Sequence, residues 1–165
     1  MVTRRSLLAA LAASAVIPQM LRADEFIDLD WVDLLPKNDT PIPQAFRGLI
    51  DHDQLPLSSQ QPDSSGVRSD WNGQIVRLPG FVVPIDQSSA GVTAFILVPY
   101  AGACVHVPPP PANQLVFVTT ETPYKSKGLY EAVNVIGMFG ISSMRTYIAD
   151  VGYALSADKI EPFRV

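Results

Sequence analysis

The chain has 165 residues, with 12 Lys and Arg against 16 Asp and Glu and a formal net charge of −4. This length is typical of one domain with one hydrophobic core. An acidic chain lacks the basic surface that binds nucleic acid or anionic lipid headgroups, so the composition argues against both kinds of partner. The single cysteine cannot close a disulfide within the chain.

The amino terminus predicts a cleaved export signal. Residues 1–5 are basic, residues 6–17 form an apolar run, and Ala23 supplies the small residue that signal peptidase needs. The run is shorter than the ~20 residues that span a bilayer, so a retained anchor is the weaker alternative and no stable membrane insertion of the mature chain is expected. The Arg4-Arg5 pair resembles the twin-arginine consensus, with Sec export as the alternative.

Cleavage near Ala23 would send the protein to the periplasm and would change its charge. Residues 1–23 contain three arginines and no acid, so 12 − 3 = 9 basic residues remain against 16 acidic ones, a formal charge of 9 − 16 = −7. Such a mature chain suits a soluble partner, a cation or a small ligand better than a polyanion.

Residues 24–70 are predicted to form one short helix and a long wrapping loop. Ile27, Trp31, Leu34 and Leu35 fall on one helical face, and Pro36 ends the helix. Prolines, serines and acids dominate the sequence from there to position 70, which is typical of irregular structure.

Residues 71–165 are predicted to form a mainly β domain. Apolar residues alternate with polar ones or form short runs, and no long helical pattern separates them. The expected strands are residues 74–78, 81–85, 92–98, 114–118, 132–138 and 145–153, with a bulge at Pro79-Gly80. We expect a small closed or partly open antiparallel barrel of the oligonucleotide-binding type, with a two-sheet sandwich as the alternative.

The segment at residues 102–114 carries the residues best suited to chemistry. Cys104 and His106 lie two positions apart, so in an extended chain both side chains project to one face and can share a zinc or copper ion. Four-coordinate zinc needs further ligands, for which Asp86 and His52 are the candidates. The competing interpretations are that Asp86 caps a turn and that His52 lies in a solvated loop.

The neighbouring residues are predicted to hold this site. Pro108, Pro109, Pro110 and Pro111 favour a stiff, left-handed extended rod, which reduces the entropy lost when a site orders. Further scaffold positions are Tyr100, Gly102, Asn113 and Gln114.

Three other interpretations of the segment stay open. His106 could activate Cys104 as the nucleophile of a thiol hydrolase, although no third group that would orient the imidazole is visible. The proline rod, with Tyr100 and Phe117, could instead form the docking edge of a non-enzymatic adaptor. Cys104 could also be a buried residue with a packing role only.

Three stretches together resemble a family of exported bacterial proteins known only as a domain of unknown function. They are residues 76–84 (VRLPGFVVP), residues 95–100 (FILVPY) and residues 102–114 (GACVHVPPPPANQ). The resemblance covers roughly residues 70 to 155, and Ala112 stands where a fifth proline would be expected. It implies a companion of an inner-membrane ABC-type permease complex or of a metal-handling system, and it implies no reaction.

Overall fold

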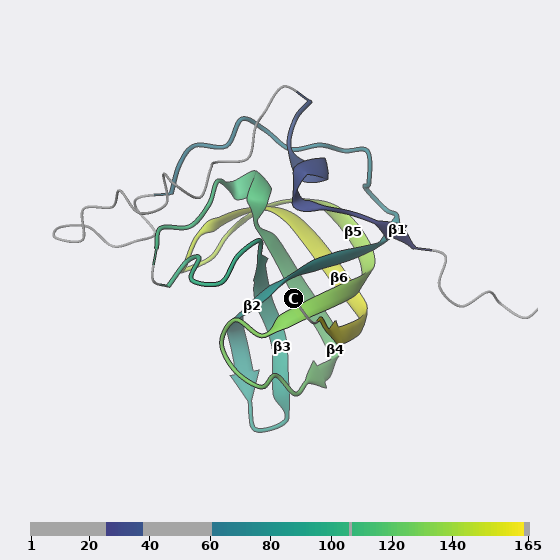
Figure 1. Ribbon diagram of the computed structural model, residues 1–165, viewed down its shortest axis with the longest axis vertical. Coiled ribbons are helices and arrows are strands. Elements are labelled where there is room, and N and C mark those ends of the chain that lie inside the picture. Colours follow the sequence, from purple (N-terminus) through teal and green to yellow (C-terminus); the bar gives the residue numbers. More distant parts are fainter. Residues whose placement is uncertain (1–25, 38–60, 106, 164–165) are drawn as a thin grey trace, which may run out of the picture.

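The computed structural model describes residues 26–37, 61–105 and 107–163 (Figure 1). Within these ranges the chain forms two short 3-10 helices and six strands, so the expected mainly β fold is confirmed. None of the helices in the described ranges is long and apolar enough to cross a membrane.

Five of the described strands close into a barrel with Greek-key order. They are β2 (Ile75–Ser88), β3 (Gly91–Val98), β4 (Val116–Tyr124), β5 (Ala132–Arg145) and β6 (Asp150–Pro162). The strands neighbour one another in the order β2-β3-β4-β6-β5, and β5 pairs back with β2. This closure excludes the sandwich and agrees with a barrel of the oligonucleotide-binding type. The expectation of purely antiparallel pairing was incomplete, because β4 and β6 run parallel.

Strand β2 is longer than predicted because the break expected at Pro79-Gly80 does not occur. The Pro79 carbonyl accepts a hydrogen bond from Trp31 Nε1 at 2.8 Å, on the side of β2 away from β5. A residue in a strand directs its N–H and its C=O to the same side. The missing N–H of Pro79 would therefore also point away from β5, so the hydrogen bonds between β2 and β5 do not need it. The register irregularities lie later, between Pro84 and Gln87.

The segment predicted as a single strand at residues 145–153 is two strand ends and a turn. The Thr146 hydroxyl donates to the Ala149 carbonyl at 2.8 Å and accepts from the Ala149 amide at 3.0 Å. The β-branched and aromatic residues of the segment 145–153 are typical of a strand. A turn closed by a threonine hydroxyl leaves only a weak signal in the sequence. The continuation of β6 to Pro162 was also not predicted.

The predicted amphipathic helix is instead a two-residue strand, β1 (Ile27–Asp28), followed by one 3-10 turn, η1 (Trp31–Leu34). Strand β1 pairs in parallel with the first residues of β2, whose free edge offers backbone partners that a helix would not use. Leu34 is nevertheless buried, and its carbonyl accepts the Tyr153 hydroxyl at 2.7 Å. The apolar spacing therefore identified a contact with the barrel but not the backbone conformation.

Two hydrophobic cores follow from the alternation of side chains along the strands. The inner core fills the barrel and includes Val82, Phe95, Leu97 and Tyr153. The second core lies on the outer face of β2 and β3, where Val83, Ile96 and Val98 contact Ala103 and Cys104 of the β3–β4 connection. This connection, residues 99–115, covers a barrel face that would otherwise be exposed.

Candidate functional site

Cys104 lies at the apex of a tight turn in the β3–β4 connection. The Val107 amide donates to the Gly102 carbonyl at 3.2 Å, and Ala103 and Val107 form an isolated β-bridge. Cys104 has a φ of 68°, in the left-handed region that costs a non-glycine residue about 1 kcal/mol or more. The fold therefore imposes a strained backbone at this cysteine.

The thiol of Cys104 is enclosed by apolar side chains. The residue is 7 % exposed and belongs to the second core with Val83, Ile96, Val98 and Leu115. Burial raises the pKa of the Cys104 thiol from 9.0 to about 12. Because nucleophilic attack and metal ligation both use the thiolate, this environment opposes the hydrolase interpretation and requires a metal to displace a strongly held proton.

The other predicted metal ligands are not gathered around Cys104 by the described part of the chain. His106 and His52 lie outside the described residues. Asp86 is exposed on β2, and its carboxylate accepts the Thr93 hydroxyl at 2.9 Å. Among the described residues no three His, Cys, Asp or Glu side chains come together in a group that could hold a metal. Metal binding stays a prediction.

The last residue of the proline run, Pro111, is extended, with φ of −52° and ψ of 152°. Pro109 and Pro110 are buried, so the middle of the run is no exposed docking edge. The Pro110 carbonyl instead accepts Gln61 Nε2 at 2.9 Å. The run therefore packs against the chain that precedes β2.

Asn113 and Gln114, predicted as scaffold, lie in the short helix η4 (Ala112–Gln114) at the barrel end that also carries η1 (Figure 1). Asn113 Nδ2 donates to Ser65 Oγ at 3.1 Å and to the Gly66 carbonyl at 2.9 Å. Gln114 Nε2 donates to the Trp31 carbonyl at 2.9 Å. These two buried amides fasten the preceding segments to the barrel.

Tyr130, which the sequence did not single out, contacts the cysteine turn. Its hydroxyl donates to the Ala103 carbonyl at 2.8 Å, and burial is the main cause that raises its pKa to about 12. Tyr130 also has a positive φ, 60°. Cys104 and Tyr130 are the non-glycine residues with a positive φ in the described part of the chain, and both lie at the cysteine turn. Tyr100 packs on the same core, and Gly102 takes a φ of 98° in the turn.

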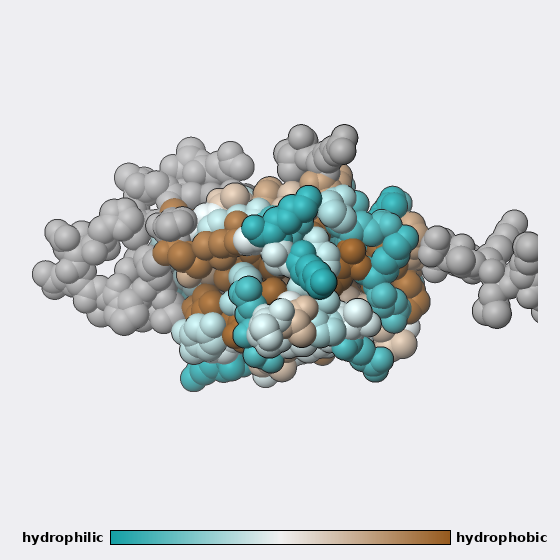
Figure 2. Space-filling view, turned by 90° about the horizontal axis from the view of Figure 1, so that it is seen from below, coloured by the Kyte–Doolittle hydropathy of each residue, from teal (hydrophilic) through white to brown (hydrophobic). Residues whose placement is uncertain are grey.

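An apolar groove on the outer face of β4, β6 and β5 was also missed by sequence reasoning. Its volume is about 460 Å³, and Phe117, Met138 and Met144 contribute its large side chains. Met138 is 54 % exposed. Figure 2, which views the barrel from the end with the β2–β3 hairpin, shows hydrophobic side chains gathered in patches between hydrophilic ones. Alternation along β5 predicts that Met138 faces outward, but not which strands lie beside it.

The comparison with family models decides the classification. The model described as "Protein of unknown function (DUF3299)" matches residues 31–162. The chain belongs to the DUF3299 family. This membership confirms, at the level of the family, the expected resemblance to a domain of unknown function.

The DUF3299 fold is also found in a solved structure. The crystal structure of a DUF3299 family protein from Pseudomonas aeruginosa PAO1, at 2.45 Å resolution, is 34 % identical in sequence, with a TM-score of 0.75. The match covers 86 % of this chain and 99 % of that one. A comparison with curated proteins found no significant match.

Proposed function

We propose that this DUF3299 protein is an exported, non-enzymatic adaptor of the cell envelope that binds a protein partner through the apolar groove on β4, β6 and β5. The groove is the observation that carries the proposal. The partner we propose is a subunit of an inner-membrane ABC-type permease, as the sequence resemblance implies. Export follows from the leader-like residues 1–23.

The strand register supports a groove built to receive large side chains. Phe117 and Gly140 both pair with Ala154, and Thr119 and Met138 both pair with Ser156. Side chains on these outer positions therefore form two rows, each with a small residue in the middle. Phe117 and Met138 stand at opposite ends of the two rows, so the space above Ala154 and Ser156 between them can accept an apolar side chain of a partner.

Met138 and Met144 expose apolar surface in the groove, and this exposure has an energetic consequence. Removing apolar surface from water yields roughly 25 cal/mol for each Å² buried, so a partner covering the groove gains affinity from it. Methionine is flexible and polarisable and can adapt to an incoming apolar surface. Cys104, in contrast, is buried with a raised pKa and offers no reactive group on the surface.

Substitution of Met138 tests this proposal. We expect Met138→Glu to weaken co-purification of a permease subunit about tenfold or more, because it places a charge in the centre of an apolar contact. A photoreactive amino acid at position 138 should crosslink to the same subunit in the producing cell. Leu129→Glu is the matched control, since Leu129 is 48 % exposed and lies on the β4–β5 connection.

Two results would contradict the adaptor proposal. One is a permease subunit that co-purifies equally with Met138→Glu and Leu129→Glu. The other is a crosslinking pattern that is the same from positions 138 and 129, which would show that the groove has no preference for the subunit.

Transition-metal binding by Cys104 and His106 is our second candidate function, with zinc as the first choice and copper as the alternative. It is supported by the strained left-handed backbone at Cys104, since strain of this kind is concentrated at functional sites. The ion would have to displace the thiol proton, which the apolar surroundings of Cys104 hold strongly. His52 and Asp86 remain the candidates for additional ligands.

Elemental analysis tests the metal candidate. If it is correct, the purified mature chain retains about one zinc or copper per molecule, and both Cys104→Ser and His106→Ala lose it. Asp63→Asn, a substitution of an exposed carboxylate outside the proposed ligand set, should retain the metal. Equal and negligible metal in all four proteins would remove this candidate.

A further inference from the structure

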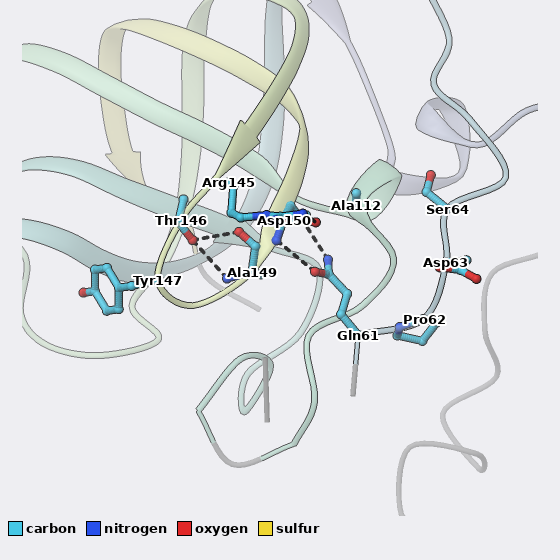
Figure 3. A pocket seen from close by; sticks show the side chains of 10 residues that line it. All are labelled: Gln61, Pro62, Asp63, Ser64, Ala112, Arg145, Thr146, Tyr147, Ala149 and Asp150. Atoms are coloured by element: carbon cyan, nitrogen blue, oxygen red, sulfur yellow. Dashed lines mark hydrogen bonds and ion pairs between the residues drawn. The ribbon is translucent and has the colours of Figure 1, made fainter. Parts of the chain in front are cut away.

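A polar pocket lies where the β5–β6 turn meets the segment that precedes β2 (Figure 3). Its volume is about 470 Å³, and its walls come from residues 61–64, Ala112, residues 145–147 and residues 149–150. A second pocket of about 620 Å³ shares Ser64, Ala112, Arg145 and Asp150 with it and extends along residues 141–145. The two pockets therefore adjoin, and together they are called the polar groove.

The walls of this groove are held by side-chain hydrogen bonds. Gln61 Nε2 donates to the carbonyls of Pro110 at 2.9 Å and Asp150 at 2.8 Å. The Asp150 amide donates back to Gln61 Oε1 at 2.8 Å. Figure 3 shows Gln61 reaching across to Asp150 from the opposite wall. A groove with fixed walls loses little entropy when a ligand binds.

The floor of the groove depends on a close backbone approach. A Cβ atom built on Gly152 would lie 2.7 Å from the Ala112 carbonyl oxygen, so a larger residue would push η4 away from β6. Gly152 and Ala112 both line the larger pocket. The shape of the groove is therefore a property of the folded barrel and not of one mobile loop.

The chemistry of the lining favours an uncharged ligand with many hydroxyl groups. Arg145 Nε and Nη2 donate to the Asp150 carboxylate at 2.9 and 3.3 Å, which leaves other guanidinium N–H groups available. The hydroxyls of Ser142 and Ser143 add donors and acceptors, whereas the Ser64 hydroxyl is bonded to the backbone of Gly66. The lining contains one arginine, which is paired with Asp150, and a second aspartate, Asp63, so it does not favour an anion.

Tyr147 adds an aromatic surface at the rim. Its side chain is 74 % exposed at the tip of the β5–β6 turn, and Figure 3 shows it extending away from the hydrogen-bonded cluster. Because Tyr147 is so exposed, rotation of its side chain can bring the ring over the groove, where it can stack on the apolar face of a sugar ring while the polar groups bind the sugar hydroxyls. We propose that this groove binds a neutral oligosaccharide. The proposal does not depend on the adaptor function, which uses the groove on β4, β6 and β5.

The test is a titration of the ¹⁵N-labelled mature chain with chitohexaose and, separately, with cellohexaose. We expect one of these glycans to shift amide resonances of residues 61–66 and 141–152. Tyr147→Ala should weaken its binding about fivefold or more, whereas Tyr147→Trp should restore it, because stacking needs an aromatic face. Leu129→Ala is the control, since its exposed side chain lies on the β4–β5 connection outside the groove lining.

Three results would overturn the glycan proposal. They are the absence of shifts with both glycans, shifts outside the groove, and binding that Tyr147→Ala leaves unchanged. A third titration, with the peptide hexa-alanine, addresses the main competing ligand, and shifts in the groove with this peptide alone would assign the groove to peptide binding. Because Tyr147 is mostly exposed, its variants should keep the melting temperature of the parent chain.

Discussion

Gly137→Ala is expected to destabilise the barrel by about 3 kcal/mol or more, the largest effect among the substitutions considered for this chain. A Cβ atom at position 137 would lie 2.0 Å from the Ser156 carbonyl oxygen and 2.8 Å from Ala157 Cα. Both atoms belong to the backbone of β6, so no side chain can rotate away. Strands β5 and β6 would have to separate at a register irregularity between Ile136 and Gly137.

Gly140→Ala is the matched control, because it adds the same methyl group to the same strand. A Cβ atom there would lie 3.3 Å from Asn72 Oδ1, which is the end of a side chain and can move. We expect this variant to lose less than about 1 kcal/mol. Urea unfolding followed by tryptophan fluorescence measures both free energies of unfolding. Equal losses for the two variants would contradict the close contact between β5 and β6.

Native Cys104 is expected to react with iodoacetamide at pH 8 about a thousandfold more slowly than the unfolded chain. The raised pKa, about 12 against 9.0, reduces the thiolate by about three orders of magnitude at a pH below both values. Burial of the sulfur slows the reaction further. The measurement is the alkylation rate by mass spectrometry in buffer and in urea, with Thr119→Cys in a Cys104→Ala background as an exposed control.

The same pKa difference predicts how stability depends on pH. The folded thiol keeps its proton above pH 9 while the unfolded thiol loses it, so the contribution of Cys104 to stability is complete below pH 9 and is lost between pH 9 and 12. The loss is on the order of 1 kcal/mol for each pH unit. Cys104→Ala should lack the decline that begins near pH 9 and keep only the part above pH 10, to which tyrosines with raised pKa such as Tyr130 contribute. Rapid alkylation at neutral pH that disappears in His106→Ala would contradict the buried thiol and support the hydrolase interpretation.

The strands could be predicted where the pattern is local. Alternation at residues 92–98 identified β3, which the structure places at Gly91–Val98. Prediction failed where a partner far away in sequence decides the conformation. Residues 26–35 have helical spacing, but the free edge of β2 takes Ile27 and Asp28 as a strand. A threonine hydroxyl ends β5 and begins a turn within a segment whose composition is typical of a strand.

The candidate site was predictable only as a segment. The spacing of Cys104 and His106 marked the β3–β4 connection as unusual, and the structure shows strain at Cys104. Nothing in the spacing indicates that the thiol packs against Val83 and Ile96 on the outside of the barrel. The polar groove could not be predicted either, because Gln61 and Asp150 are 89 positions apart and meet only in the folded chain.

By itself, the sequence determined the class of the protein, since apolar alternation and turn residues act over a few positions and specify a small β barrel. It also carried the match to the DUF3299 family over residues 31–162. Only the tertiary structure decided that β4 and β6 lie in parallel, that Cys104 is enclosed, and that two outer grooves exist. The reason is that burial and close backbone approach depend on contacts between distant segments, which local sequence patterns do not encode.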